Sequence, residues 1–421
     1  MVTTLVIIMA VLLLLGFPIM IPLMLAPLVL IIVYFPYTEP FFLVQQMLNG
    51  ISTFSLMAVP MFIFAADIMT RGRTSKRLLD FIGSFVAHIR GGYAVTTAVS
   101  CALFGSISGS TQATVVAIGR PMRERLLKVG YKDSSAIAFI INSSDIALLI
   151  PPSIGFIIYA LPSQTSVGDL FIAGIGPGLL ILLFFTIYAY IHARMFNIPL
   201  AEKATWRERF YHTRQAALPL MFPVIIIGGI YSGFFTATEA SGMAVLYALI
   251  LEVLVYRSVK VTDIPKIALS TGLVTSAVFV LVAGGQAFAY AISTAQIPRM
   301  IIDNLLGGDP GPIYVMIIVS LFFFIGCMFM DPIVVILILT PIFMPAAEAA
   351  GIDPIHLGVL IVFQAAMGSA TPPFGVDIFT ASAVFNRSYL DTIRGTPPFI
   401  IMLFIVNILL IFFPQISLFL L

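Results

Sequence analysis

The sequence predicts an all-α polytopic membrane protein made of two inverted-topology repeats, each with one re-entrant hairpin and one broken transmembrane helix. Three observations predict this fold. The 421 residues are 60% hydrophobic and only 10% charged, too few charges to cover a soluble protein of this length. Apolar runs recur along the whole chain, and a membrane span needs about 20 such residues. Stretches rich in glycine, serine or proline interrupt several of these runs.

The interruptions occur in matching pairs. Each landmark of the first half has a counterpart 221 residues later: 105–110 (GSISGS) and 326–331 (GCMFMD), Pro151-Pro152 and Pro372-Pro373, Gly130 and Gly351, Ala160 and Ala381. A shared spacing predicts an internal repeat. Interrupted apolar segments at corresponding positions of two halves are typical of a transporter binding site. The alternative interpretation is that the prolines only kink helices and the small residues only pack them.

The first predicted repeat covers residues 1–196. It begins with a single apolar segment that prolines kink. We interpret this segment as a retained first span and not as a cleaved signal peptide, because it has no basic region before it and no small-residue cleavage site. A re-entrant hairpin follows later in the chain, because each arm beside its break has about 13 residues and cannot cross alone. In order, we expect the apolar segment at 2–33, an interfacial stretch at 37–48, a span at 50–70, an amphipathic arm at 71–90, the hairpin at about 92–120, a broken span at 133–162 and a span at 169–195.

Residues 197–233 are predicted to hold a polar linker and one extra transmembrane helix, at 215–231. The second repeat then covers residues 234–421. In order, we expect spans at 234–256 and 271–295, an amphipathic stretch near 296–307, a hairpin at about 312–348, a broken span at 352–384 and a last span at 393–413.

The basic residues predict the orientation of these elements. When both hairpins return to the side from which they enter, all 21 Lys and Arg except Arg299 fall on one face. The positive-inside rule makes that face cytoplasmic. The first hairpin then enters from the cytoplasm and the second from outside, since the crossing at 215–231 inverts the second half.

The breaks predict a set of neutral oxygen ligands. Proline lacks an N–H and its ring displaces the carbonyl four residues earlier, so the proline pairs free the carbonyls of Ala147, Leu148, Gly368 and Ser369. The first tip adds hydroxyl groups, and the second adds carbonyls and Asp331. Neutral oxygens at membrane depth suit Na⁺, and the N-termini of half-helices suit an anionic substrate.

Acidic residues in apolar surroundings are a second indication of a functional site, because each such residue costs about 2.5–3.5 kcal/mol at the centre of a membrane. They are Asp67, Asp145, Glu239, Asp331 and Asp377. Asp145 ends a polar island at 142–145, where it either lines a site or makes a structural hydrogen bond. Asp67 is interpreted as a charge at the end of its span, and the role of Asp377 stays open.

Catalytic motifs are poor. The sequence has no Walker A loop, and residues 105–109 depart from a nucleophile elbow because the third position is Ile107 and no histidine lies in the segment. We therefore predict that the chain is not an enzyme, and the net charge of +2 gives no indication of a nucleic-acid partner.

Four motifs together resemble the large membrane subunit (DctM-like) of tripartite ATP-independent periplasmic (TRAP) transporters: 59–62 (VPMF), 104–110 (FGSISGS), 149–153 (LIPPS) and 370–373 (ATPP). The resemblance covers essentially the whole chain. It implies a multi-pass protein of the bacterial inner membrane, of the ion-transporter superfamily, that takes up an organic acid with Na⁺ by an elevator mechanism. The implied substrates are a C4-dicarboxylate, a sialic acid or a related sugar acid. A periplasmic binding protein and a separate four-helix membrane subunit are the implied partners, beside membrane lipid.

The resemblance also implies two Na⁺ sites, each between a hairpin tip and a broken span. Carried onto this chain, the first uses Ser106, Ser108 or Ser110 with carbonyls around Ala147, Ile150 and Pro152, and the second uses Gly326, Gly368 and Thr371. The substrate is expected between the two tips, against Thr111, Asn142, Ser144 and Ser369. The alternative function is a stand-alone Na⁺/divalent-anion symporter or a Na⁺/H⁺ antiporter of a related fold; a channel or a membrane-embedded enzyme fits the broken spans less well.

Overall fold

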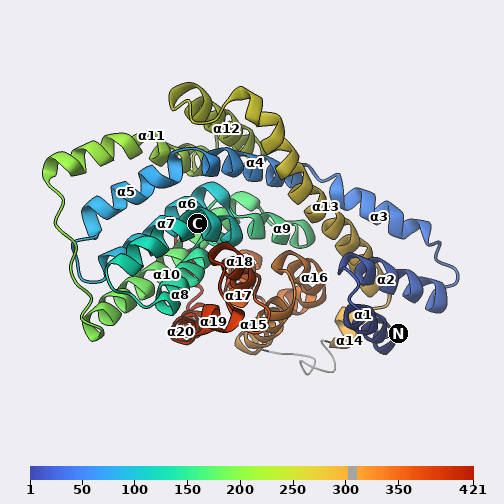
Figure 1. Cartoon of the computed structure of the whole chain (residues 1–421). Helices are drawn as coiled ribbons and strands as arrows, with labels where there is room; N and C mark the ends of the chain where they lie inside the picture. The colour runs from blue at the N-terminus through green and yellow to red at the C-terminus, as the bar shows by residue number, and fades with distance from the viewer. Residues whose placement is uncertain (302–310) are drawn as a thin grey trace.

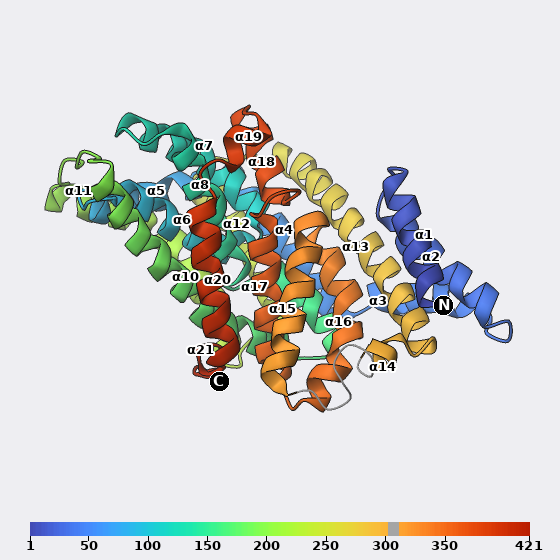
Figure 2. The ribbon, with the colours of Figure 1, turned by 90° about the horizontal axis from the view of Figure 1, so that it is seen from below.

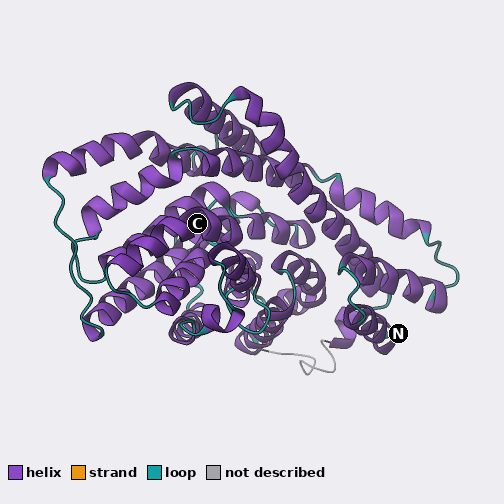
Figure 3. Ribbon diagram, viewed as in Figure 1, coloured by secondary structure: helices purple, strands orange, loops and turns teal. Residues whose placement is uncertain are grey.

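A computed structural model describes residues 1–301 and 311–421. Within these residues the secondary structure is helical, with no strand, and most connections are short (Figure 3). Seven helical segments are long and apolar enough to cross a membrane: Phe54–Arg71, Val167–Met195, Trp206–Tyr231, Ala237–Val255, Val261–Thr294, Pro312–Phe329 and Pro332–Ala349. The protein is therefore a multi-pass membrane protein.

One group of helices, which we name the scaffold helices, borders one side of the molecule (Figure 1). In this group α12 packs on α4, α11 packs on α5, and the long α13 crosses α2, α3 and α4. The group consists of α1 (Val2–Leu14), α2 (Met20–Tyr34), α3 (Phe41–Ile51), α4 (Ala58–Arg71), α5 (Thr74–Val86), α11 (Trp206–Tyr231), α12 (Ala237–Leu249) and α13 (Ile264–Thr294).

The second group, the hairpin bundle, lies against the scaffold helices and contains both helical hairpins (Figures 1 and 2). Its main contacts with the scaffold are those of α6 with α5 and of α16 with α13. The first-half members are α6 (Gly92–Ser108), α7 (Thr111–Lys128), α8 (Asp133–Ser144), α9 (Ile154–Ser163) and α10 (Val167–Met195). The second-half members are α15 (Pro312–Phe329), α16 (Pro332–Ala349), α17 (Pro354–Ser369), α18 (Val376–Phe385), α19 (Tyr389–Ile393), α20 (Pro397–Phe412) and α21 (Gln415–Leu418).

The two halves of the bundle repeat the same order of elements, as the paired motifs predict. A hairpin turns at 109–110 in the first half and at 330–331 in the second. Each second arm ends at a glycine with positive φ, Gly130 (95°) and Gly351 (70°), and each Pro-Pro bond in the following break is cis. The predicted domain boundaries and the inverted relation of the halves to the membrane stay predictions.

The first apolar segment differs from its prediction. Instead of one kinked segment over 2–33, two helices form, and residues 15–19 separate them at Gly16, where φ is 80°. The hydroxyl groups of Thr4 and Tyr34 lie 2.7 Å apart, so the start of α1 meets the end of α2. Thirteen or fifteen helical residues span about 20 Å, which is less than the membrane core.

The polar linker also differs in part, because its second half is helical. Thr205 caps α11 and exchanges hydrogen bonds with Glu208 in a capping box, which fixes the start of the helix at Trp206. Of the second predicted amphipathic stretch, near 296–307, only a short helix α14 (Ile297–Ile301) lies within the described residues. The first arm is present as the amphipathic α5.

Glu252 joins the beginning of this arm to the scaffold. It lies fully buried in a π-helical turn, Ile250–Val255, that continues α12. Its carboxylate accepts hydrogen bonds from the backbone N–H groups of Arg73 and Thr74, at 3.1 and 3.2 Å, and from the hydroxyls of Thr74 and Ser258. It therefore satisfies N–H groups that the first turn of α5 leaves without intrahelical partners.

An ion-pair cluster connects the two halves of the bundle. Asp133, at the start of α8, accepts from Arg123 of α7 at 2.6 Å and from Arg387, which follows α18, at 2.8 Å. Side chains of both halves thus meet at this end of the bundle, where these ion pairs connect the first hairpin to the second broken helix.

Candidate functional site

The first hairpin tip lies directly on the first broken helix. The backbone of Gly109 is left-handed, with φ of 59°, and the N–H of Ile154 donates to its carbonyl at 3.3 Å. A Cβ on Gly109 would lie 2.5 Å from the carbonyl oxygen of Pro152, so only glycine permits this approach. Ser110 then caps α7 by accepting from the N–H of Ala113.

The second tip meets the second broken helix in the same way. The N–H of Phe374 donates to the carbonyl of Met328 at 3.1 Å. Asp331 caps α16, since one of its carboxylate oxygens accepts from the N–H of Ile333 at 2.9 Å. Each hairpin is therefore joined by a backbone hydrogen bond to the break of its own half, at the two places where the family resemblance implies Na⁺ sites.

Helix packing keeps each hairpin close to its break. A Cβ at Gly105 would lie 2.5 Å from Cα of Ala147. In the second half, a Cβ at Gly368 would lie 2.4 Å from Cβ of Cys327, the residue after Gly326. Ala147 and Gly368 occupy corresponding positions of the repeat, so a small residue at this position allows the hairpin to approach its break in both halves.

The structure gathers the oxygen-bearing residues predicted for the first Na⁺ site around this contact. Ser106 donates to the carbonyl of Leu103, and Ser108 lies between the carbonyl of Ser110 and the hydroxyl of Thr114. Ala147 packs on Gly105, and Pro152 faces Gly109. The side chain of Ile150, by contrast, points at Gly178 of α10, which leaves only its backbone carbonyl for an ion.

The residues predicted for the second site also come together at one break. The carbonyl of Gly326 accepts from Met330, and that of Gly368 accepts from the N–H of Thr371 at 3.1 Å. The Thr371 hydroxyl donates to Met367. Each carbonyl oxygen retains a second lone pair, and among the described residues no group of three or more His, Cys, Asp or Glu side chains is placed to hold a metal.

Two buried acids lie between the halves. The Thr111 hydroxyl donates to one oxygen of Asp377 at 2.8 Å, which links the first tip to the second broken helix. The other oxygen of Asp377 and both oxygens of Asp145 make no hydrogen bond within the described residues. The sequence singled out both acids but not the hydrogen bond from Thr111, which ties Asp377 to the first tip.

A cavity of about 690 Å³ separates the two tips from the scaffold helices. Its walls come from both tips, from the broken helices, and from α4 and α13. The polar wall residues are Asp67, Ser108, Ser110, Thr111, Gln112, Asp331, Ser369 and Thr380. The volume suits a small molecule.

Two of the four predicted substrate contacts line this cavity, Thr111 and Ser369. Asn142 and Ser144 do not line it. Both are fully buried and donate to carbonyls of their own helix, those of Ala138 and Ile141. The polar island at 142–145 is therefore buried and forms no part of the cavity wall.

Asp67 is a wall residue that the sequence interpretation placed at the end of a span. One of its oxygens accepts from the hydroxyl of Thr271 on α13, at 2.7 Å. The two residues are far apart in the chain, and Thr271 starts a mainly apolar stretch. No local sequence pattern therefore predicts that they meet. The α13 wall residues, from Leu273 to Leu281, carry no sequence signal for the same reason.

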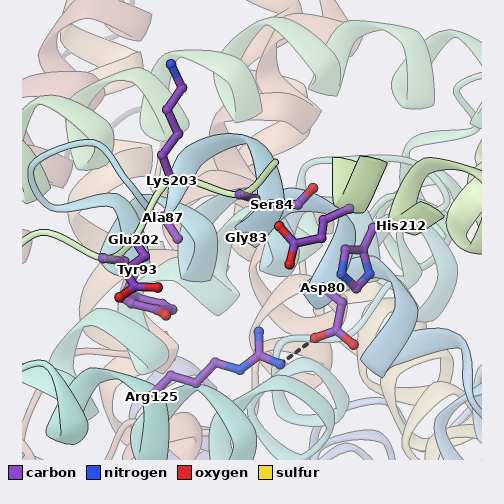
Figure 4. A pocket seen from close by; sticks show the side chains of 12 residues that line it. Asp80, Gly83, Ser84, Ala87, Tyr93, Arg125, Glu202, Lys203 and His212 are labelled. Atoms are coloured by element: carbon purple, nitrogen blue, oxygen red, sulfur yellow. Dashed lines mark hydrogen bonds and ion pairs between the residues drawn. The ribbon is translucent and has the colours of Figure 1, made fainter. Parts of the chain in front are cut away.

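A second hollow lies away from the tips, among α5, α7, the linker and α11 (Figure 4). Its volume is about 350 Å³, and an ion pair of 2.6 Å joins Asp80 to Arg125 across it. Lys203, Glu202 and His212 also face it (Figure 4). Because it contains neither tip nor break, we place the functional site in the cavity between the tips.

Known proteins agree with this architecture. Residues 6–416 match the family model described as "Tripartite ATP-independent periplasmic transporter, DctM component". The chain is 58% identical over 415 residues to the ectoine/5-hydroxyectoine TRAP transporter large permease protein UehC of Ruegeria pomeroyi, covering 98% of this chain and 96% of that one. It is 58% identical over 410 residues to the ectoine TRAP transporter large permease protein TeaC of Halomonas elongata, covering 97% and 96%.

A solved structure shares the fold at low sequence similarity. The Alcanivorax borkumensis YdaH transporter superposes with a TM-score of 0.65 over 89% of this chain and 88% of its own, at 13% identity. The family match and the two relatives confirm the resemblance read from the four motifs. The chain belongs to the DctM family, the large permease component of tripartite ATP-independent periplasmic transporters, and is a transport protein, not an enzyme.

Proposed function

We propose that this permease carries ectoine, or a closely related cyclic zwitterion, into the cell together with Na⁺. The observation that carries the proposal is the cavity between the two hairpin tips, bounded by the bundle on one side and the scaffold on the other. The two relatives at 58% identity are both named for ectoine. Ectoine has a carboxylate, like the organic acids expected from the sequence. It also has a cationic amidinium, so the proposed substrate is a zwitterion and not a dicarboxylate.

The carboxylate end of the substrate has a suitable partner in the first tip. Residues 110–113 line the cavity at the start of α7, where the unpaired N–H groups and the helix dipole favour a negative charge. Thr111 and Ser369 add hydroxyl groups to the same cavity. The substrate would thus touch both halves of the hairpin bundle.

Na⁺ would bind where each tip meets its break. The first set comprises Ser106, Ser108, Ser110 and the carbonyls of Ala147, Ile150 and Pro152, and the second comprises Gly326, Gly368 and Thr371. Ions bound there fix the tips against the breaks and so shape the substrate cavity from behind. Each Na⁺ that moves inward gains about 2.3 kcal/mol per 100 mV of membrane potential.

Alternating access would arise from sliding of the hairpin bundle along the scaffold helices, an elevator motion. The cavity lies at the boundary between these groups, and the ion pairs of Asp133 hold the bundle together as one body. The amphipathic α5 joins the scaffold to α6 and would act as the arm. The family implies two partners, a small membrane subunit, here of four helices, and a periplasmic binding protein that delivers the substrate, in the bacterial inner membrane.

The experiment is uptake of radiolabelled ectoine into proteoliposomes that contain this permease and its small subunit. We expect uptake only with an inward Na⁺ gradient and the substrate-loaded binding protein. Uptake that needs Na⁺ alone would favour a stand-alone symporter. Uptake of succinate but not ectoine, each offered with its own binding protein, would overturn the substrate assignment.

Replacing both Pro151 and Pro152 by alanine is expected to weaken the response to Na⁺. Alanine restores N–H donors to the break, so the carbonyl of Ala147 regains a helical partner and the first ion set loses its geometry. The Na⁺ concentration for half-maximal ectoine uptake should rise about tenfold, equivalent to about 1.4 kcal/mol. The matched control replaces both Pro219 and Pro223, which lie in the scaffold helix α11, by alanine. A double variant at 151 and 152 with the wild-type Na⁺ response would contradict the first site.

A further inference from the structure

We infer that Asp67 is the specificity-determining residue that receives the positively charged end of the substrate in the cavity between the tips. This rests on the proposed function, uptake of a zwitterion, and goes beyond it by naming the group that distinguishes a zwitterion from a dicarboxylate. The observation behind it is the charge of the cavity wall.

That wall carries acidic side chains and no basic ones among the described residues. Its only charged residues within the described part of the chain are Asp67 and Asp331, and no lysine, arginine or histidine lines it. Arg71, one turn beyond Asp67 on α4, acts on Asp67 electrostatically but does not reach the wall. A dicarboxylate would bring two negative charges to a wall whose charged residues are all acidic, whereas a cationic group would be attracted to an ionised wall carboxylate.

Asp67 and Asp331 differ in which carboxylate oxygens remain free to accept a hydrogen bond from a substrate. Asp331 caps α16 at the second tip, so one oxygen is committed to the hairpin, and the residue lies beside the second ion set. Asp67 belongs to the scaffold. Thr271 holds one of its oxygens at 2.7 Å and so fixes the carboxylate, and the residue lines the cavity. Asp67 therefore presents a fixed acceptor opposite the tips.

The chemistry of an amidinium matches this acceptor. An amidinium is planar and delocalises its charge over two nitrogens; in the ectoine ring each nitrogen carries one N–H, and either can donate a charge-assisted hydrogen bond to the Asp67 oxygen that Thr271 does not hold. With its carboxylate at the start of α7, a short zwitterion would extend from the bundle to Asp67 on the scaffold. Substrate charge would then be read at the boundary between the two groups of helices.

A cysteine reporter tests the charge of the cavity without transport. Ala277 on α13 lines the cavity and is exposed, and the native Cys101 and Cys327 are buried, so Ala277→Cys places one accessible thiol there. We expect a trimethylammonium methanethiosulfonate to modify it faster than the sulfonate analogue, and ectoine to slow both reactions. Adding Asp67→Asn should reduce the cation-to-anion rate ratio by about fivefold or more. The matched control is Asp263→Asn at the start of the same helix, which should leave the ratio unchanged.

Uptake kinetics test the role of Asp67 in recognition. In proteoliposomes with the partner subunit and binding protein, Asp67→Asn should raise the KM for ectoine about tenfold to a hundredfold, the loss of one charge-assisted hydrogen bond, with a smaller change in maximal rate. Because asparagine keeps an oxygen for Thr271, the local fold is retained. Asp67→Glu should recover part of the affinity, and Thr271→Val should give an intermediate KM.

The outcomes separate the role of Asp67 from the proposed function. An unchanged KM and an unchanged cation-to-anion rate ratio in Asp67→Asn would overturn the role of Asp67 while ectoine uptake stands. Wild-type protein that takes up no ectoine would overturn the proposed function. In that case the rate ratio still tests the charge of the cavity wall, and a ratio that Asp67→Asn leaves unchanged would overturn the role of Asp67 as well.

Discussion

Replacing Gly105 by alanine is expected to lower ectoine uptake by at least about tenfold and to reduce thermal stability. The added methyl group would lie 2.5 Å from Cα and 2.6 Å from Cβ of Ala147. Both atoms belong to rigid backbone or to its first side-chain atom, so α6 must move away from the break. Such overpacking costs about 1–3 kcal/mol, and the displacement separates the first tip from the carbonyls that we assign to Na⁺. Uptake in proteoliposomes and thermal unfolding of the purified permease measure the two effects.

The chain offers a matched control for this substitution. Gly242 lies in α12, and a Cβ added there meets no atom within 4 Å. Gly242→Ala should leave uptake unchanged and stabilise the helix by about 0.5–1 kcal/mol, the usual gain from alanine over glycine. Gly368→Ala, at the contact between the second hairpin and its break, should resemble Gly105→Ala because Cβ of Cys327 lies 2.4 Å from the added atom. Wild-type uptake and stability in Gly105→Ala would show that the close contact is not required.

Replacing Glu252 by alanine is expected to destabilise the permease by about 3–5 kcal/mol. The carboxylate is fully buried and accepts from two backbone N–H groups and two hydroxyls. Each donor left buried without a partner costs about 1–3 kcal/mol, and α5 loses the group that holds its first turn to α12. The purified protein should unfold at a markedly lower temperature and show faster proteolysis at residues 72–76.

Two variants distinguish capping from mere loss of volume. Glu252→Gln keeps an acceptor oxygen and the shape of the side chain, so it should lose less stability than alanine. Thr74→Val removes one of the donors and retains the carboxylate, so its effect should be smaller again. Equal stability of wild type and Glu252→Ala would contradict the role of this buried acid.

The sequence located the breaks because their residues have properties that apolar helices lack. Proline removes a donor and glycine permits a left-handed turn, so Pro151-Pro152 and Gly109 predict interruptions wherever they occur. The hairpin turns at 109–110 and 330–331 fall inside the predicted stretches. The predicted ion ligands lie at these interruptions, and for that reason the structure brings both sets together.

Other parts of the fold carried no decisive local signal. The segment 2–33 has the composition of one long span, and its division into α1 and α2 depends on packing of the two helices, with Thr4 against Tyr34. Asn142 and Ser144 looked like site residues because they are polar in an apolar run. The Asn142 amide N–H and the Ser144 hydroxyl donate to preceding carbonyls of the same helix, and sequence alone does not distinguish such intrahelical donors from ligand-binding groups.

The sequence by itself determined that the chain is a membrane-embedded helical repeat with two interrupted segments in each half, because composition, proline and glycine act locally. Only the tertiary structure decided what the interruptions enclose. Asp67 meets Thr271, and Thr111 meets Asp377, across more than 200 residues of chain. The cavity exists only where the tips approach α4 and α13, and its acidic wall is a sum over residues that no local pattern connects. Contacts between distant segments depend on how helices pack, and periodicity within one helix does not encode its partner.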